Sequence, residues 1–413
     1  FHKTFSVYHI PVVKKLIYLD HSATTAVDPQ VFAAMKPYFS DLYGNPSSIY
    51  QLAQKSRQAI DLSREISAGI LEASSREIIF TSGGTESNNL FILGAAQALK
   101  PFGKHIITTK IEHDSVLNPI RFLEKQGFEV TYLDVYKNGI VKVSDVEKAF
   151  RKDTILITII YANNEIGTIQ PIAEIGEVIK NHRAKTINSS TAKAGQSPLV
   201  PYFHTDACQA ASYLDLSVKN LNIDAMTLNG GKIYGPKGVG LLYLKESSEI
   251  TPQIFGGTQE RRIRAGTENV PAIRGFGEAL KLVYADRENE VRRLLPLRDK
   301  LIKGILKISN SRLNGDDKKR LANNINISFK GIDSGALLIK LDMLGIAASA
   351  GSACSSGSLE PPHVLMALGV PPEWISGTVR FTLGHGNTGK DIDFLLKKLS
   401  EIIEELREIS PFV

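Results

Sequence analysis

Apolar residues fall into two alternating patterns over the first 250 residues of the chain. Short apolar runs of four to seven residues are typical of buried strands, while apolar residues recurring every three or four positions indicate helices. The predicted strands span residues 16–19, 77–80, 105–109, 128–133, 154–160, 202–206, 224–229 and 239–244. The predicted helices span residues 28–38, 49–73, 90–99, 115–126, 144–150 and 171–179. This alternation predicts an α/β fold with a mainly parallel sheet, whose ligands bind at the carboxyl ends of the strands.

The last third of the chain has a different order of elements. Two helices, 270–295 and 298–308, lead away from the first region. The remaining elements mix the two types, with strands at 322–329, 346–350 and 378–383 and helices at 363–368 and 388–409. A chain of 413 residues also favours two domains over one core.

We therefore divide the chain near residue 275. The expected parts are an N-terminal extension (1–15), a segment that packs with the small domain (16–26), a large domain (27–275) and a smaller α+β domain (276–413). Residues 181–199 are rich in Ser, Thr, Ala and Lys and show little periodicity, so we interpret them as a surface insertion in the large domain.

Composition excludes several classes of protein. The net charge is +6, but Lys and Arg are dispersed, so no nucleic-acid-binding surface is indicated. No apolar run approaches the roughly 20 residues of a membrane span, and the N-terminus lacks a secretory-signal pattern. The only cysteines, Cys208 and Cys354, are too few for a disulfide framework, which favours a reducing, cytoplasmic location. We predict no metal site.

Polar residues that could carry chemistry follow the predicted strands. Gly84 and Thr85 lie in a glycine-rich turn that opens a helix, where backbone N–H groups can bind a phosphate. Lys232 lies between small residues, where desolvation could make its amine nucleophilic. Each feature alone is explained as readily by a capped helix or an ordinary turn. The other candidates in this pattern are His113, Asn164, Asp206 and Gln209.

Together these residues match the needs of pyridoxal phosphate. A helix N-terminus can hold its phosphate, and an imidazole can stack on its ring. A carboxylate can keep the ring nitrogen protonated, and a lysine can bind its aldehyde covalently. Because the carboxyl ends of parallel strands meet at one sheet edge, we expect the candidates to converge there.

The order of the motifs closely resembles that of the cysteine desulfurases of the NifS and IscS kind, which are fold-type I pyridoxal-phosphate enzymes. The resemblance extends from about residue 17 to the C-terminus. It rests on YLDHSATT (18–25), YGNPSS (43–48), TSGGTESNN (81–89), IEHDSV (111–116), NNEIGTIQPI (163–172), HTDACQ (204–209), KIYGPKGVG (232–240), RAGTENV (264–270), SAGSACSSGSLEP (349–361) and VRFTLG (379–384). It implies a large domain with a mainly parallel seven-stranded sheet between helices and a smaller α+β C-terminal domain.

The resemblance also implies a role for each candidate residue. Lys232 would bind the cofactor covalently and carry the proton, and Cys354 would accept the sulfur. The remaining implied roles are phosphate binding by Gly84, Thr85 and the neighbouring subunit's Thr267, ring stacking and proton movement by His113, ring-nitrogen pairing by Asp206, ring-oxygen contacts by Gln209 and Asn164, and binding of the substrate carboxylate by Arg380.

Two of the positions that depart from the family pattern lie close to Lys232. Asn229 and Gly231 stand where the family usually has Ser and His, so Asn229 is the remaining side chain there that could bind the phosphate. The two cysteines also differ from one another. Cys354 lies in a loop of small residues, which suggests an exposed thiol, whereas Cys208 lies in an apolar run and is expected to be inert.

The resemblance implies a homodimer that takes sulfur from L-cysteine, releases L-alanine and leaves a persulfide on Cys354. The acceptor would be an iron–sulfur scaffold or a tRNA-thiolation protein. A selenocysteine lyase remains an alternative, because it shares the scaffold. A catalytically weakened partner protein that acts by binding remains another, because of Gly231.

Overall fold

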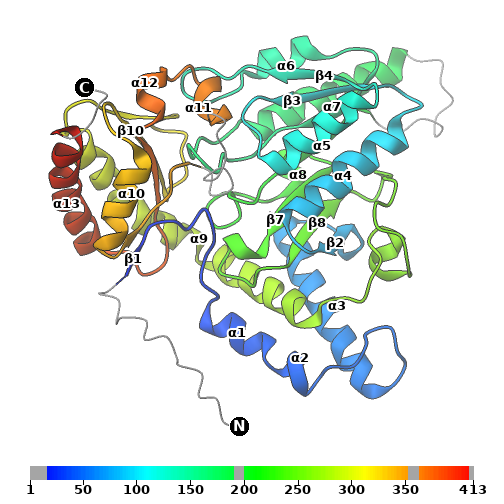
Figure 1. The fold of residues 1–413 in the computed structure, drawn as a ribbon. Coiled ribbons are helices and arrows are strands. Elements are labelled where there is room, and N and C mark those ends of the chain that lie inside the picture. The colour runs from blue at the N-terminus through cyan, green and yellow to red at the C-terminus, as the bar shows by residue number, and fades with distance from the viewer. Residues whose placement is uncertain (1–15, 190–199, 352–361, 409–413) are drawn as a thin grey trace, which may run out of the picture.

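The computed structural model describes residues 16–189, 200–351 and 362–408 (Figure 1). The predicted N-terminal extension, residues 190–199 of the predicted insertion, and Cys354 lie outside these ranges. Side chains are described throughout except at residues 186–189.

The larger part of the molecule is built on a seven-stranded sheet with the order β2-β8-β7-β6-β5-β3-β4. Its strands are β2 (Ile78–Thr81), β3 (His105–Thr109), β4 (Glu129–Leu133), β5 (Thr154–Thr158), β6 (Tyr202–Asp206), β7 (Ala225–Asn229) and β8 (Gly240–Leu244). Only β8 runs against the others, because it follows β7 as the second strand of a hairpin. The predicted mainly parallel seven-stranded sheet is confirmed.

Helices cover both faces of this sheet. Neighbouring strand residues separate into two cores: Ile106 packs with the helices on one face and Ile107 with those on the other. The first face is covered by α4 (Gly84–Leu99) and α5 (Asp114–Lys125). The second face is covered mainly by α3 (Gln51–Leu71), α6 (Val143–Ala149), α7 (Ile172–Ser189) and the first half of α9 (Val270–Ile305). The short helices are α1 (Pro29–Met35), α2 (Pro37–Ser40) and α8 (Val218–Leu221).

A second hydrophobic core forms around a three-stranded antiparallel sheet with the order β12-β10-β9. Its elements are β9 (Ser311–Leu313), β10 (Asn324–Phe329), β12 (Thr378–Thr382), α10 (Ser334–Met343) and α13 (Gly389–Glu408). Two short helices, α11 (His363–Ala367) and α12 (Pro372–Ile375), follow α10 in sequence and pack against the first core. The N-terminal strand β1 (Ile17–Tyr18) pairs with β11 (Ile346–Ala347), so the start of the described chain packs on this smaller part.

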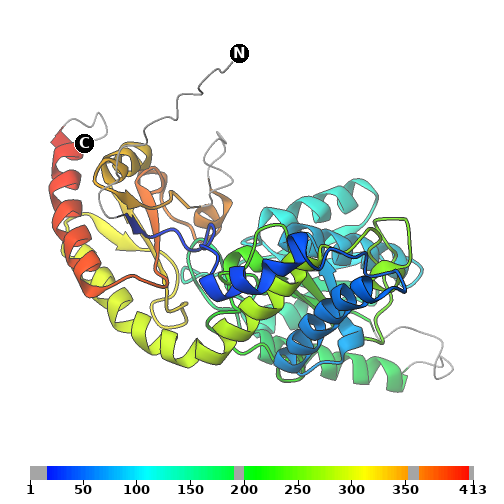
Figure 2. The same ribbon diagram turned by 90° about the horizontal axis from the view of Figure 1, so that it is seen from below.

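Helix α9 connects the two cores. Phe276 and Leu280 belong to the first core, whereas Leu294 and Leu301 belong to the second. Figure 2 shows this helix running from the larger part of the molecule to the smaller one. The prediction of two helices here is wrong, because the helix continues through Pro296. We propose that the domain division falls within α9.

The structure also changes the interpretation of the polar segment after residue 180. Helix α7 continues through Ser189, although the composition predicted an irregular insertion. Arg183 explains part of this result, since its guanidinium is buried and forms an ion pair with Asp224. The same guanidinium donates to Pro201 O, which links the helix to the strand that follows. Residues 190–199 lie outside the described ranges.

Among the described residues, no helix is both long enough and apolar enough to cross a membrane.

Candidate active site

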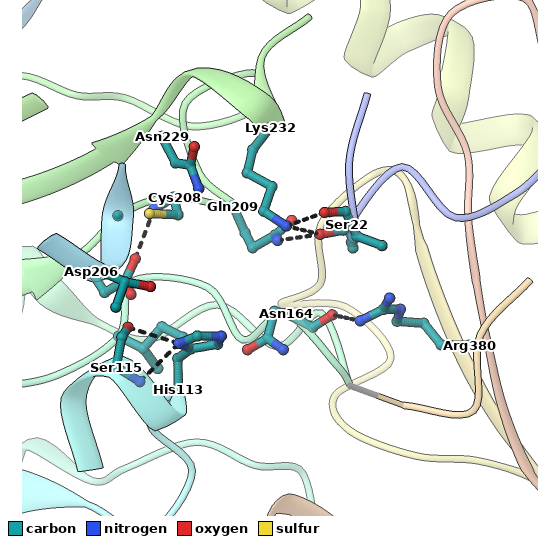
Figure 3. A pocket seen from close by; sticks show the side chains of 14 residues that line it. Ser22, His113, Ser115, Asn164, Asp206, Cys208, Gln209, Asn229, Lys232 and Arg380 are labelled. Carbon is teal, nitrogen blue, oxygen red and sulfur yellow. Dashed lines mark hydrogen bonds between the residues drawn. The ribbon is translucent and has the colours of Figure 1, made fainter. Parts of the chain in front are cut away.

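A pocket lies at the carboxyl ends of the parallel strands, between the large sheet, the N-terminal segment and β12 (Figure 3). Nine predicted site residues line it: Gly84, Thr85, His113, Asn164, Asp206, Gln209, Asn229, Lys232 and Arg380. Five further residues complete it: Ser22, Ala23, Ser115, Ile160 and Cys208. Thr267 is exposed and does not line it, and Cys354 lies outside the described residues.

Lys232 ends a short 3-10 turn, Gly230–Lys232, directly after β7. The Asn229 side chain caps this turn by accepting a hydrogen bond from Gly231 N at 3.1 Å. The amine Nζ of Lys232 donates to Ser22 O at 2.6 Å and also to Ala23 O. The backbone of the N-terminal segment therefore holds the amine in the pocket, a contact that sequence patterns did not predict because carbonyl groups leave no signature.

Helix α4 points its N-terminus at one end of the pocket. Its N-cap residue, Gly83, has no side chain to satisfy the first N–H groups of the helix. A Cβ atom on Gly84 would lie 2.8 Å from Cys208 Sγ and 3.6 Å from Asn229 Nδ2. A side chain at position 84 would therefore clash with Cys208, so a glycine is needed there. The glycine also leaves the helix N-terminus open toward an anion.

The pocket also holds a carboxylate. Asp206 Oδ2 accepts a hydrogen bond from Asn88 Nδ2 at 2.8 Å, and Oδ1 accepts one from Cys208 N at 3.0 Å. The same Asn88 nitrogen donates to Ser115 Oγ, which lies 2.7 Å from His113 Nδ1. Asn88 and Ser115 were not predicted as site residues, although TSGGTESNN and IEHDSV contain them. These two residues connect Asp206, the predicted partner of the ring nitrogen, to His113, the predicted ring-stacking residue.

Gln209 also touches the N-terminal segment. Its amide nitrogen Nε2 donates to Ser22 O at 3.0 Å, so Gln209 and Lys232 share one carbonyl acceptor. The side chains of Gln209 and Lys232 therefore lie close together, from two different strand ends.

Arg380 enters the pocket from β12 of the smaller sheet. Its side chain is 2% exposed, which excludes a plain surface ion pair. One guanidinium nitrogen donates to Asp20 Oδ1 at 2.7 Å and another donates to Asn164 O at 2.9 Å. Its Nε is buried and has no hydrogen-bond partner within the described ranges. Two partners far from Arg380 in sequence therefore hold the guanidinium in place. Its remaining N–H groups can still donate to a carboxylate.

Cys208 fits the expected inert thiol. Burial raises the pKa of this thiol well above its ordinary value, and the nearby Asp206 carboxylate adds to the effect. The group is therefore held in its neutral, poorly nucleophilic form.

Two buried glutamates near the site were not predicted. Burial raises the pKa of Glu112 to about 8, even though its carboxyl accepts hydrogen bonds from Thr109 Oγ1 and Ile160 N. Burial likewise raises the pKa of Glu165, against the opposing charges of His363 and Arg380. Both pKa shifts result from burial in the folded structure, so they could not be predicted from the sequence.

The pocket fits a phosphorylated pyridine aldehyde. An open helix N-terminus, an amine, a carboxylate and an imidazole all line one cavity, and Gly84 provides the close approach that a phosphate needs at that helix. Groups of three or more His, Cys, Asp or Glu side chains suited to a metal ion are absent from the described residues.

Comparisons with known proteins agree with this geometry. The aminotransferase class-V family model matches residues 17–395. A cysteine desulfurase IscS of Methanosarcina thermophila is 50% identical, covering 98% of this chain and 96% of its own. One of Dictyoglomus turgidum is 48% identical, covering 97% and 98%.

Solved structures give the same result. A NifS-like protein has a TM-score of 0.85 at 33% identity, covering 95% of this chain and 100% of its own. A NifS-like protein from Rickettsia africae has a TM-score of 0.82 at 32% identity, covering 94% and 99%. The fold is therefore that of the fold-type I enzymes, and the chain belongs to the cysteine desulfurases within the class-V aminotransferase family.

Proposed function

We propose that this cysteine desulfurase takes the sulfur of L-cysteine onto Cys354 and releases L-alanine. The observation that carries the proposal is the shared pocket: the Lys232 amine, the Asp206 carboxylate and the Arg380 guanidinium line one cavity. The curated relatives named as cysteine desulfurases favour this activity over a selenocysteine lyase or a weakened binding partner.

Pyridoxal phosphate is the proposed cofactor. The N-terminus of α4 at Gly84 and Thr85, together with Asn229, would hold its phosphate. Asp206 would pair with its ring nitrogen, His113 would contact its ring, and Gln209 and Asn164 would lie near its ring oxygen. When bound at Lys232, the cofactor supplies an electron sink that makes the α-proton of the substrate acidic.

The chain's own residues would handle the substrate. Arg380 would bind the carboxylate of L-cysteine, because its guanidinium is already fixed by Asp20 and Asn164 O. The Lys232 amine would remove the α-proton and later return a proton. Its carbonyl partners at Ser22 and Ala23 hold it in the pocket.

Sulfur transfer would take place on Cys354. Its thiolate attacks the substrate sulfur, so that an S–S bond forms while the substrate's C–S bond breaks. The electron pair of the broken bond and one proton remain with the carbon product, which leaves as L-alanine. The persulfide sulfur then passes to an acceptor, for which an iron–sulfur scaffold or a tRNA-thiolation protein is proposed.

A homodimer completes the proposal. Large apolar side chains lie exposed on α1, on α2 and in two loops: Phe32 (58% exposed), Phe39 (62%), Ile49 (95%) and Phe255 (81%). Burying them against a second copy would remove this surface from water. The same contact would allow the partner to supply the phosphate contact proposed for Thr267. We propose the cytoplasm as its location, in keeping with the two cysteines.

A pair of lysine variants tests the proposal. Lys232 and Lys237 lie in one turn and both donate to the N-terminal segment, but only Lys232 lines the pocket. Lys232→Ala should abolish both the visible absorption of bound pyridoxal phosphate and alanine formation. Lys237→Ala should keep both. Equal losses in the two variants would show that the turn, and not the amine of Lys232, is what matters.

A further inference from the structure

A line of hydrogen bonds connects two residues that line the pocket, Asp206 and His113. It runs from Asp206 through Asn88 and Ser115 to His113. Figure 3 shows its last step, from Ser115 to His113. Asn88 is fully buried and Ser115 nearly so. The line joins α4 to α5 and ends on the one imidazole that faces the pocket.

The direction of each hydrogen bond in this line is determined by chemistry. A carboxylate only accepts, so the Asn88 atom that faces Asp206 must be the amide nitrogen, and its two hydrogens go to Asp206 and Ser115 Oγ. Since Ser115 Oγ accepts from Asn88, its own hydrogen is available for His113 Nδ1 at 2.7 Å.

A second donor reaches the same ring nitrogen. His113 is the N-cap of α5, and Ser115 N donates to its Nδ1 at 3.0 Å. A backbone N–H can only donate, so Nδ1 is an acceptor for two groups and carries no proton. The neutral ring must then hold its hydrogen on Nε2, at the edge that points into the pocket (Figure 3).

We propose that Ser115 fixes His113 as the Nε2–H tautomer through its backbone N–H and its hydroxyl, and that Asn88 is a positioning residue that sets the direction in which this hydroxyl donates and ties it to Asp206. The His113 ring then presents its Nε2–H group to the pocket as a hydrogen-bond donor of fixed orientation. The Asp206 carboxylate determines which way each hydrogen bond of the line runs. It accepts from the Asn88 amide, which also donates to the Ser115 hydroxyl, and this hydroxyl donates to His113. The use of the Nε2–H group in the reaction rests on the proposed function, but the tautomer itself does not.

The substitution Asn88→Asp reverses the part of the line that runs from position 88 to His113. The new carboxyl group would lie beside the Asp206 carboxylate, so it would keep its proton, donate it to Asp206 and accept the hydrogen of Ser115. Ser115 Oγ can then accept from a protonated Nδ1, at the cost of the bond from Ser115 N. Asn88→Ala removes the donor without offering an acceptor, so the Ser115 hydroxyl still donates to His113. Ser115→Ala breaks the line but keeps the backbone N–H at residue 115.

The test is ¹⁵N NMR of the holoenzyme with labelled histidine, with the His113 signals assigned from a His113→Gln variant. The wild type, Asn88→Ala and Ser115→Ala should each show the Nε2–H form. Asn88→Asp should show a new population protonated at Nδ1. The double variant Asn88→Asp/Ser115→Ala should return to the Nε2–H form, because the hydroxyl that transmits the change is gone.

Other outcomes would overturn the proposal. A wild type protonated at Nδ1 contradicts the assignment directly. An Asn88→Asp spectrum like that of the wild type shows that Asn88 does not set the direction of the Ser115 hydroxyl, and a double variant that still resembles Asn88→Asp shows that this hydroxyl does not transmit the change. If Asn88→Asp does not fold, the wild-type tautomer still decides the assignment. Ser115→Ala should also lower kcat about 10-fold with KM within about twofold, and Ser115→Thr should restore it.

Loss of desulfurase activity in every form, wild type included, would instead contradict the proposed function while leaving the NMR result intact. The surface variant Ser144→Ala, on α6, serves as the unaffected control.

Discussion

The two walls of the pocket are assembled in different ways. One wall consists of side chains at successive strand ends of the large sheet, among them Asp206 and Lys232. The other wall consists of the N-terminal segment and β12, which lie about 360 residues apart in sequence and are joined by contacts such as Asp20 with Arg380. The first wall depends on a sheet that is buried on both faces, and the second depends on a few specific bonds. Substitutions should therefore affect the two walls differently.

The largest effect is expected from the two cysteines. Cys208 lines the large-sheet wall as a neutral thiol, whereas Cys354 lies outside the described residues and is the proposed sulfur acceptor. Cys354→Ala should lower desulfurase activity more than about 1,000-fold, because the sulfur acceptor is lost, while cofactor absorption persists. Cys208→Ala should stay within about threefold of the wild type. The opposite ranking would mean that Cys208 is the acceptor.

The next largest effect is expected at Arg380. Removing a buried, hydrogen-bonded charge costs about 2–5 kcal/mol, so Arg380→Ala should raise KM for L-cysteine about 100-fold. Asp20→Asn keeps the guanidinium but weakens its orientation, and should raise KM only about fivefold. Steady-state kinetics measures both. If the two variants behave alike, Arg380 matters through Asp20 and not through the substrate.

A smaller effect is expected at the two glycines of the large-sheet wall. A Cβ atom at Gly84 meets Cys208 Sγ at 2.8 Å, whereas one at Gly231 meets nothing closer than 3.6 Å. Gly84→Ala should therefore weaken pyridoxal-phosphate binding about 10-fold, and Gly231→Ala should leave it unchanged. Adding Cys208→Ala to Gly84→Ala removes the clashing sulfur and should restore most of the affinity in a cofactor titration. A double variant as weak as Gly84→Ala would show that the clash is not the cause.

The smallest effect concerns stability at Glu112, behind the same wall. Its pKa is about 8 in the folded protein, above the ordinary 4.5, because the carboxyl is buried. The folded state thus binds the proton more tightly than the unfolded state, so the wild type loses stability as pH rises from about 4.5 to about 8. Glu112→Gln cannot titrate there. Its Tm relative to the wild type should rise by a few degrees between pH 5 and about pH 9.

A flat difference in Tm over that range would show that Glu112 does not titrate in this interval. Glu129→Gln, an exposed glutamate on β4, is the matched control and should show little pH-dependent change.

Sequence patterns predicted the large-sheet wall well, for a physical reason. Period and length identify strands, and parallel strands bring their carboxyl ends together, so Asp206 and Lys232 could be placed before any coordinates. The N-terminal contacts of the other wall, and the contacts beneath the large-sheet wall, could not be predicted in this way. Ser22 and Ala23 act through backbone carbonyls, Asn88 and Ser115 act through contacts between helices, and the raised pKa of Glu112 comes from burial. The unbroken course of α9 was missed because Pro296 is a helix-breaking signal that packing overrode.

The central claim is that this pocket moves sulfur from L-cysteine to one thiol of the chain. Holoenzyme mixed with L-cysteine in the absence of an acceptor, and then digested and analysed by mass spectrometry, tests it most directly. The account predicts one added sulfur atom on the peptide that contains Cys354, with alanine formed in equal amount. Sulfur on the Cys208 peptide, or alanine formed with no sulfur retained on the protein, would contradict it.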